Sequence, residues 1–183
     1  NVCISPGSRN SPLTYAFTLQ AGITCYSHVD ERSSAYFALG LAKSTKRPVV
    51  VISTSGTATA NHFPAIIEAS LSRIPICILS ADRPKNLIGT GENQTINQQY
   101  LYGEYPRYFK DIGLPTDNFD SLEKILQQAM NHSMGADLKT PPGPIHLNCP
   151  FNEPLMPDVL QKIEHPEFSF EPSKSIETDS TNI

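Results

Sequence analysis

The sequence has neither an excess of basic residues nor a long apolar run. Its 14 Lys and Arg residues are outnumbered by 18 Asp and Glu residues, giving a formal net charge of −4 and an isoelectric point near 5.7. Such a chain offers no basic surface to a polyanion, so we expect no nucleic-acid partner. No apolar run approaches the roughly 18 residues that span a bilayer, and no signal-peptide pattern opens the chain. We therefore expect a soluble, cytoplasmic protein without a membrane span, whose partners are small molecules.

Several motifs of common enzyme classes are also missing. The sequence contains neither GxGxxG nor GxxxxGK[ST], which argues against a dinucleotide site and a Walker loop. It contains neither HExxH nor GxSxG, which excludes zincins and α/β-hydrolases.

The cysteines and histidines show no pattern of metal ligands. The four cysteines lie in or beside apolar segments without CxxC spacing, so we expect buried, reduced thiols in a reducing compartment rather than a zinc site or disulfides. We expect surface or packing roles for His62, His132 and His165, and core positions for His28 and His146.

The 183 residues, of which 39% are hydrophobic and 17% charged, suit one globular domain with a buried core. The chain opens at Asn1 without a methionine and enters an apolar segment at once, so we expect it to be part of a longer polypeptide. Short apolar runs alternate with longer amphipathic stretches, which predicts an α/β fold of three layers, with helices on both faces of a mostly parallel central sheet. The expected strands are 2–5, 23–27, 49–53, 74–79 and 145–148, and the expected helices are 11–20, 30–43, 57–70 and 120–134.

Three segments add detail to this pattern. The uninterrupted apolar run 49–52 predicts a central strand that is buried on both faces. Residues 89–111 lose periodicity and gain aromatic side chains, so we expect a long irregular connection with one short helix there. We expect the domain to occupy residues 1–155 and residues 156–183 to be a linker or disordered tail toward an absent central domain.

Two loops that follow predicted strands carry arginines. Open parallel sheets bind ligands at the carboxyl ends of their strands. The loop SPGSRNSPL places a turn glycine, a hydroxyl and the Arg9 guanidinium ahead of a helix N-terminus, which either favours an anion or only builds the turn. The loop SADRPKNLIGTGENQTINQ places Arg83 directly after a strand, followed by Asn93 and Gln94. A lone Arg83 could simply end the strand, but two arginines at one sheet edge indicate an acidic substrate.

Two further loops that follow predicted strands can also be explained either by ligand binding or by local structure alone. HVDERSSAYFALGLAK places Asp30, Glu31 and Arg32 where a strand meets a helix, and acidic residues there ordinarily only compensate the helix dipole. STSGTATAN runs from a strand into small residues, which either let a ligand ring approach the backbone or allow close packing of helix on strand.

Five segments, taken together and in this order, resemble one enzyme family. They are SPGSR, DER before ALGLAK, TSGTATAN with PAIIEAS, LSADRP, and ENQTINQ, and the later PGPIHLNCPFNEPL fits the same family. Residues 2–155 are thereby similar to the N-terminal, pyrimidine-binding domain of the 2-succinyl-5-enolpyruvyl-6-hydroxy-3-cyclohexene-1-carboxylate synthases, which depend on thiamin diphosphate. The resemblance implies a transferase that decarboxylates 2-oxoglutarate and adds the succinyl-semialdehyde carbanion to isochorismate, in menaquinone or phylloquinone biosynthesis.

The resemblance also implies roles for eight residues. Glu31 would be the catalytic residue and would bind the cofactor through N1′ of its aminopyrimidine ring, where a carboxyl is needed because a proton is shared. Burial would raise the pKa of that carboxyl, which suits proton sharing near neutral pH. Gly7 and Asn61 would line the same ring as cofactor-binding residues. Substrate carboxylates and hydroxyls would be held by Ser8, Arg9, Arg83, Asn93 and Gln94.

One motif of the family is missing from this chain. Thiamin-diphosphate enzymes hold the diphosphate and Mg²⁺ (or Mn²⁺) through GDG followed further on by Asn, and the sequence contains no GDG. The resemblance therefore implies no metal ligand in this chain, a second subunit of a homodimer or tetramer that completes the active site, and an inactive fragment.

Two alternatives stay open. Another thiamin-diphosphate 2-oxoacid decarboxylase or acetolactate-type synthase would use Glu31 in the same way with a different acceptor, although its substrates need fewer cations than Arg9 and Arg83 supply. A non-catalytic α/β module that binds a ligand or partner would need Glu31 only as a helix-start acid.

Overall fold

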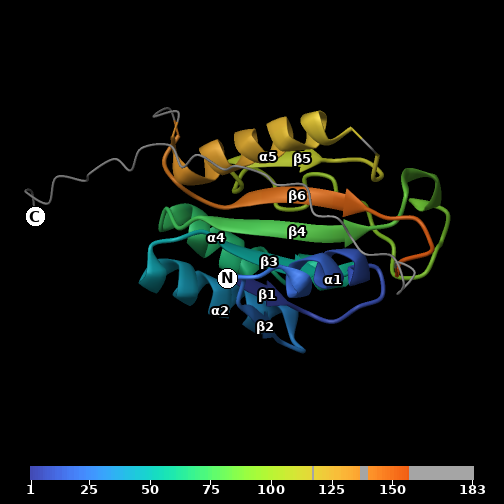
Figure 1. The fold of residues 1–183 in the computed structure, drawn as a ribbon, viewed down its shortest axis with the longest axis horizontal. Helices are drawn as coiled ribbons and strands as arrows, with labels where there is room; N and C mark the ends of the chain where they lie inside the picture. The colour runs from blue at the N-terminus through green and yellow to red at the C-terminus, as the bar shows by residue number, and fades with distance from the viewer. Residues whose placement is uncertain (117, 137–139, 157–183) are drawn as a thin grey trace, which may run out of the picture.

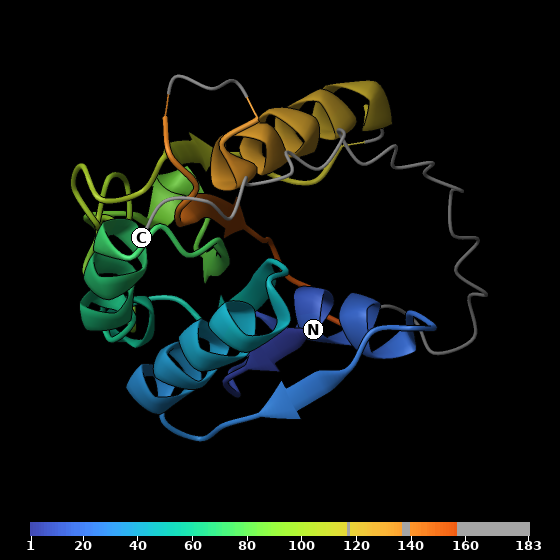
Figure 2. The same ribbon diagram turned by 90° about the vertical axis from the view of Figure 1, so that its left-hand side faces the viewer.

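The computed structural model describes residues 1–116, 118–136 and 140–156. Over these residues the strands form one six-stranded sheet in the order β2-β1-β3-β4-β6-β5, and every neighbouring pair is parallel. Helices lie on both faces of this sheet (Figures 1 and 2). The predicted three-layer α/β architecture is confirmed.

The elements alternate along the chain as the sequence predicts. The strands are β1 (Val2–Ile4), β2 (Cys25–Ser27), β3 (Val49–Ser53), β4 (Ile76–Asp82), β5 (Tyr108–Asp111) and β6 (Ile145–Pro150). The helices are α1 (Ser11–Leu19), α2 (Glu31–Thr45), α3 (Thr57–Ala60), α4 (Phe63–Leu71) and α5 (Phe119–Met134), with a 3-10 turn, η1, at Lys85–Leu87. Within the described residues, no helix is long and apolar enough to cross a membrane.

The core is divided between the two faces of the sheet because side chains alternate along each strand. Cys3, Val51 and Ile78 point toward the face covered by α2 and α4. The neighbours of these residues along each strand point toward α1 and α5 on the opposite face (Figure 2). β3 pairs with β1 and β4, so the predicted central strand is confirmed.

The order of the strands creates a switch point between β1 and β3. β2 lies on one side of β1, whereas β3 and all later strands lie on the other side. Loops that leave the carboxyl ends of β1 and β3 therefore turn to opposite faces and open a crevice between them, which is where open α/β sheets bind ligands.

Two local predictions are wrong. The single helix predicted over 57–70 is two helices, α3 and α4, because Pro64 has no N–H to donate to the Ala60 carbonyl and its ring crowds that group. The connection 89–111 ends in an edge strand, β5, that pairs with β6, and the short helix of this region, η1, precedes the connection. The prediction of a tail over 156–183 falls, except for Met156, outside the described residues.

Candidate functional site

The loops after β1 and β3 touch at the switch point, and their contact depends on a glycine. A Cβ atom on Gly7 would lie 2.3 Å from Cβ and 2.7 Å from Oγ1 of Thr54. Thr54 is buried and directly follows β3, which is paired on both sides. Gly7 also borders a cavity of about 350 Å³ between the carboxyl end of β1, Ser27 of β2 and the start of α1. Gly7 therefore allows the two loops to approach closely beside this cavity.

Glu31 is the first residue of α2, but it does not cap the helix. Asp30 is the N-cap, and its side chain accepts a hydrogen bond of 2.7 Å from the Ser33 backbone N–H. That bond lowers the pKa of Asp30. The half-buried Glu31 carboxylate instead accepts a bond of 3.1 Å from Nδ2 of Asn61, which ends α3. The structure thus brings the predicted cofactor-binding residues Glu31 and Asn61 into contact. Because Asp30 caps the helix, the Glu31 carboxylate is not needed for that role.

Arg9 lies in the loop after β1 and is buried. Its guanidinium donates 3.0 Å to the Phe151 carbonyl and 3.4 Å to Oε1 of Glu153, whose side chain is 75% exposed. Nε of Arg9 has no hydrogen-bond partner among the described residues. Ser8, the neighbouring predicted site residue, is exposed. The Arg9 guanidinium therefore has an exposed ion-pair partner, Glu153, and an Nε–H group that forms no hydrogen bond within the described residues.

Arg83 follows β4 and reaches across to the loop after β3. Its Nη1 donates to Oγ of Ser55 and, at 3.3 Å, to the Gln94 carbonyl. Gln94 and Asn93 are exposed, and Gln94 has a left-handed backbone with φ of 55°. The structure thus places Arg83 in contact with the backbone of Gln94, and the substrate-binding roles of Arg83, Asn93 and Gln94 stay predictions.

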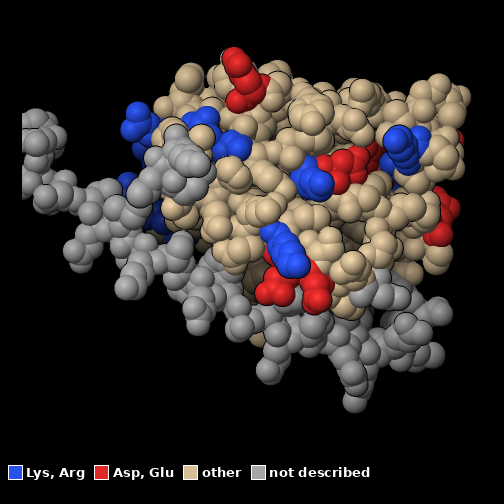
Figure 3. Space-filling view, turned by 90° about the horizontal axis from the view of Figure 1, so that it is seen from above, with Lys and Arg blue, Asp and Glu red and all other residues tan. Residues whose placement is uncertain are grey.

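The two arginines influence each other electrostatically. Burial, and then the neighbouring positive charge of Arg9, lower the pKa of Arg83. On the face seen in Figure 3, most of the Lys and Arg side chains gather toward the left end, whereas the Asp and Glu side chains lie mainly in the middle and at the right. Arg9 and Arg83 are thus neighbouring positive charges at the carboxyl edge of the sheet, and the carboxylates of Asp82, Glu92 and Glu153 also act on Arg83.

The sequence analysis missed a buried polar network beneath these loops. Gln98 is fully buried and contacts Gly56, Ala81 and Asn148 through hydrogen bonds of 2.7, 3.2 and 2.8 Å. Oγ of Ser80 donates 2.9 Å to Oδ1 of Asn148. Polar residues inside the apolar strands β4 and β6 are the sequence signal that could have indicated this network.

A second buried cluster surrounds Tyr102. Its hydroxyl lies 2.8 Å from Oγ1 and 2.6 Å from the carbonyl of Thr59, and 3.4 Å from Nδ1 of His62. Burial lowers the pKa of His62 to about 4 and, together with the charge of His62, lowers that of His146 to about 3. The predicted packing role of His62 and core position of His146 are confirmed.

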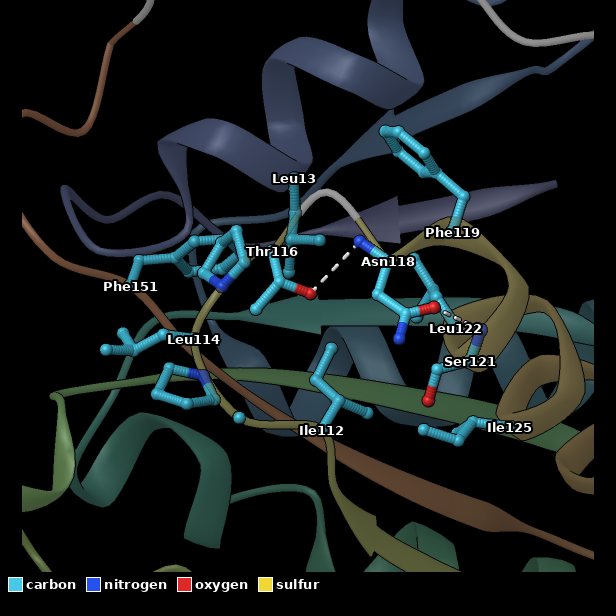
Figure 4. A pocket seen from close by; sticks show the side chains of 13 residues that line it. Leu13, Ile112, Leu114, Thr116, Asn118, Phe119, Ser121, Leu122, Ile125 and Phe151 are labelled. Carbon is cyan, nitrogen blue, oxygen red and sulfur yellow. Dashed lines mark hydrogen bonds between the residues drawn. The ribbon is translucent and has the colours of Figure 1, made fainter.

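The structure also contains a cavity that no motif predicted. It has a volume of about 300 Å³ and lies at the carboxyl ends of β5 and β6. Leu13, Ile112, Leu122 and Ile125 contribute apolar side chains to its lining, and Thr116, Asn118 and Ser121 contribute polar ones (Figure 4). None of the eight predicted site residues lines this cavity.

Comparison with known proteins decides the family. Residues 1–101 match the family model described as the N-terminal TPP binding domain of thiamine pyrophosphate enzymes. This match covers more than half of the chain and includes all eight predicted site residues. The chain belongs to the thiamine pyrophosphate enzyme family. Thiamine pyrophosphate is the same compound as thiamin diphosphate.

Three curated relatives of this thiamine pyrophosphate enzyme domain carry the same name. The chain is 52% identical over 155 residues to the 2-succinyl-5-enolpyruvyl-6-hydroxy-3-cyclohexene-1-carboxylate synthase of Chlorobium phaeobacteroides. It is 51% identical over 156 residues to that of Haloquadratum walsbyi and 47% identical over 163 residues to that of Lysinibacillus sphaericus. The alignments cover 85%, 85% and 89% of this chain but only 26%, 25% and 28% of the relatives. The chain spans about a quarter of the length of these relatives.

Proposed function

We propose that this chain is the pyrimidine-side domain of a synthase that decarboxylates 2-oxoglutarate and adds the succinyl-semialdehyde unit to isochorismate, in menaquinone or phylloquinone biosynthesis. The observation that carries the proposal is the geometry of Glu31 in a chain of this family. Asp30 caps α2, and the Glu31 carboxylate is held instead by Asn61 at the end of α3. A capping or dipole role alone does not call for that contact.

The site fits the aminopyrimidine half of the cofactor. Oε2 of Glu31 is engaged by Asn61, which leaves the other carboxylate oxygen able to hold a proton at N1′ of the ring. The cavity of about 350 Å³ beside Gly7 leaves room for a flat ring at the carboxyl end of β1. When bound, thiamin diphosphate supplies the electron sink that decarboxylation of a 2-oxoacid requires.

Glu31 is only half-buried in this chain. A second subunit that packs over the start of α2 would complete the burial expected to raise the pKa of a catalytic carboxyl. We assign the diphosphate and Mg²⁺ (or Mn²⁺) to a domain of that subunit, because the sequence contains no GDG.

The arginines favour a polyanionic substrate. Arg9 and Arg83 both carry buried Nε–H groups without partners among the described residues. A carboxylate can accept two parallel bonds from one guanidinium, which gives both charge neutralisation and orientation. 2-Oxoglutarate and isochorismate each carry two carboxylates, whereas pyruvate or an aldehyde offers fewer.

The catalytic assignment is tested in the complete enzyme with the Glu31→Gln variant. Glutamine cannot exchange a proton with N1′, so hydrogen–deuterium exchange at C2 of the bound cofactor should slow by about a hundredfold or more. Glu104→Gln, at an exposed position, is the matched control and should exchange at the wild-type rate. An unchanged rate in Glu31→Gln would refute the role of Glu31.

The split-site assignment is tested with the 183-residue chain alone. We expect it to bind thiamin diphosphate poorly and to release no carbon dioxide from 2-oxoglutarate, because it lacks the diphosphate half of the site. Appreciable decarboxylation by this chain in the presence of Mg²⁺ would contradict the proposal.

A further inference from the structure

A buried glutamine connects the carboxyl ends of three strands beneath the candidate substrate site. Oε1 of Gln98 accepts a bond of 2.7 Å from the Gly56 backbone N–H, in the loop after β3. Nε2 donates 3.2 Å to the Ala81 carbonyl of β4 and 2.8 Å to Oδ1 of Asn148 in β6. The side chain has no exposed surface. Its amide therefore uses three of its four hydrogen-bonding positions to hold three elements at fixed distances.

This network extends from Gln98 to the backbone of Arg83. Nδ2 of Asn148 donates 2.8 Å to Oδ2 of Asp82, and Oδ1 of Asp82 accepts 2.7 Å from the Arg83 N–H. Asn148 and Asp82 are both buried. The position of the Arg83 backbone is thus linked to Gln98 through two intervening side chains.

Gln98 also holds the loop after β3, which carries a hydrogen-bond acceptor of the Arg83 guanidinium. Gly56 has a left-handed backbone with φ of 81°, and a Cβ there would lie 2.9 Å from the Gln94 carbonyl oxygen. Ser55 and the Gln94 carbonyl are the groups to which Arg83 donates. Without Gln98, the buried N–H of Gly56 would lose its partner, and such a loss favours movement of the loop.

We propose that Gln98 is a positioning residue for substrate binding, and that it fixes Arg83 at both its backbone and its guanidinium. This proposal rests on the proposed function only in taking Arg83 as the group that binds an anionic substrate. Gln98 itself lies beneath the loops and does not face the crevice with an exposed atom. Its effect is therefore on substrate affinity rather than on the chemical step.

The first test measures backbone hydrogen exchange in the 183-residue chain. In Gln98→Met, which keeps the length of the side chain without its polar atoms, exchange at the Gly56 and Arg83 amides should accelerate by about tenfold or more. Amides in β1 should keep their wild-type rates. Gln128→Met, at an exposed position of α5, is the matched control and should change none of these rates. Unchanged exchange at Gly56 and Arg83 in Gln98→Met would overturn the proposal.

The second test measures the kinetics of the complete enzyme at two pH values. Gln98→Met should raise the KM for isochorismate by about tenfold at both pH 6 and pH 8, with kcat within threefold of wild type. Gln98→Glu should bind nearly as well as wild type at pH 6, where a buried, protonated carboxyl can accept from Gly56 and donate to Ala81 or Asn148. At pH 8 the ionised carboxylate has no donor, and the KM should rise as in Gln98→Met.

The outcomes separate this proposal from the proposed function. A loss of kcat with unchanged KM, or identical defects of Gln98→Glu at both pH values, would show a packing role and overturn the positioning role. If the wild-type complete enzyme did not turn over 2-oxoglutarate with isochorismate, the proposed function would fail, and the exchange rates of Gly56 and Arg83 would still decide whether Gln98 positions Arg83.

Discussion

The contact between Gly7 and Thr54 predicts that a single added methyl group destabilises the domain. In Gly7→Ala the new Cβ would lie 2.3 Å from Cβ and 2.6 Å from Cγ2 of Thr54. Carbon atoms prefer separations of about 3.5–4.0 Å, so the two loops must part by more than 1 Å. Overpacking of this kind costs about 1–3 kcal/mol. Gly7 does not have a left-handed backbone, so the whole cost is steric.

We expect the free energy of unfolding of Gly7→Ala to fall by about 2 kcal/mol in urea denaturation, and its Tm to fall by roughly 4–8 °C. Gly40→Ala is the matched control, because a Cβ at that position of α2 meets no atom within 4 Å. It should stabilise the chain by about 0.5–1 kcal/mol through helix propensity. Combining Gly7→Ala with Thr54→Gly removes the clash, so the double variant should be more stable than the sum of the single changes predicts. Equal stabilities of Gly7→Ala and Gly40→Ala, or strict additivity in the double variant, would refute the steric argument.

Three further predictions follow from the hydrogen bonds and buried groups. In the complete enzyme, Asn61→Ala removes the donor to Glu31 and should slow C2 exchange of the cofactor by about tenfold; a rate equal to wild type would show that Asn61 does not orient Glu31. Because burial lowers the pKa of His62 to about 4 and of His146 to about 3, the unfolded chain binds protons below about pH 6.5 that the folded chain does not. The free energy of unfolding should therefore be highest above pH 6.5 and should fall as the pH falls toward 4. At pH 5 we expect a loss of about 2 kcal/mol per histidine. In urea titrations, His62→Gln should show about half of the loss that the wild type shows. A thiol reagent at pH 8 should label only the half-buried Cys25 in the native chain, because burial raises the pKa of the other three thiols to about 11 or 12, and labelling of two or more thiols would contradict the described core.

The sheet could be predicted because its strands carry a strong local signal. The apolar run at Val49–Ser53 identifies the centre of a parallel sheet wherever it occurs in the chain. β5 has no such signal: in Tyr108–Asp111 three positions are half-buried and Lys110 is exposed, and the strand forms at the edge because β6 offers it a partner. The extension of β4 to Asp82, three residues past the predicted end, likewise depends on its pairing with β6.

The position of the predicted site residues at one edge of the sheet could be predicted for a different reason, and their roles stay predictions. Arg83 follows β4 directly, Arg9 and Glu31 lie within five residues of the ends of β1 and β2, and the carboxyl ends of parallel strands meet at one edge of the sheet. Polar residues in β4 and β6 could have indicated a buried network, but the partners of Gln98 in it were not predictable, because Gly56 and Asn148 are 42 and 50 residues away along the chain. Local sequence cannot show which polar groups meet when such distant segments fold together.

The charges at this edge give a reason to prefer the synthase over a simple decarboxylase. The Arg9 guanidinium has Glu153 as its ion-pair partner, at 3.4 Å and with an exposed carboxylate, and such pairs contribute only about 0–1 kcal/mol. The Asp82 carboxylate accepts hydrogen bonds from the Arg83 backbone N–H and from Asn148, and not from the Arg83 guanidinium. Two neighbouring guanidinium groups therefore repel each other; burial, and then this positive charge of Arg9, lower the pKa of Arg83. An anionic ligand that displaces Glu153 and bridges both arginines relieves that repulsion, and a neutral acceptor does not.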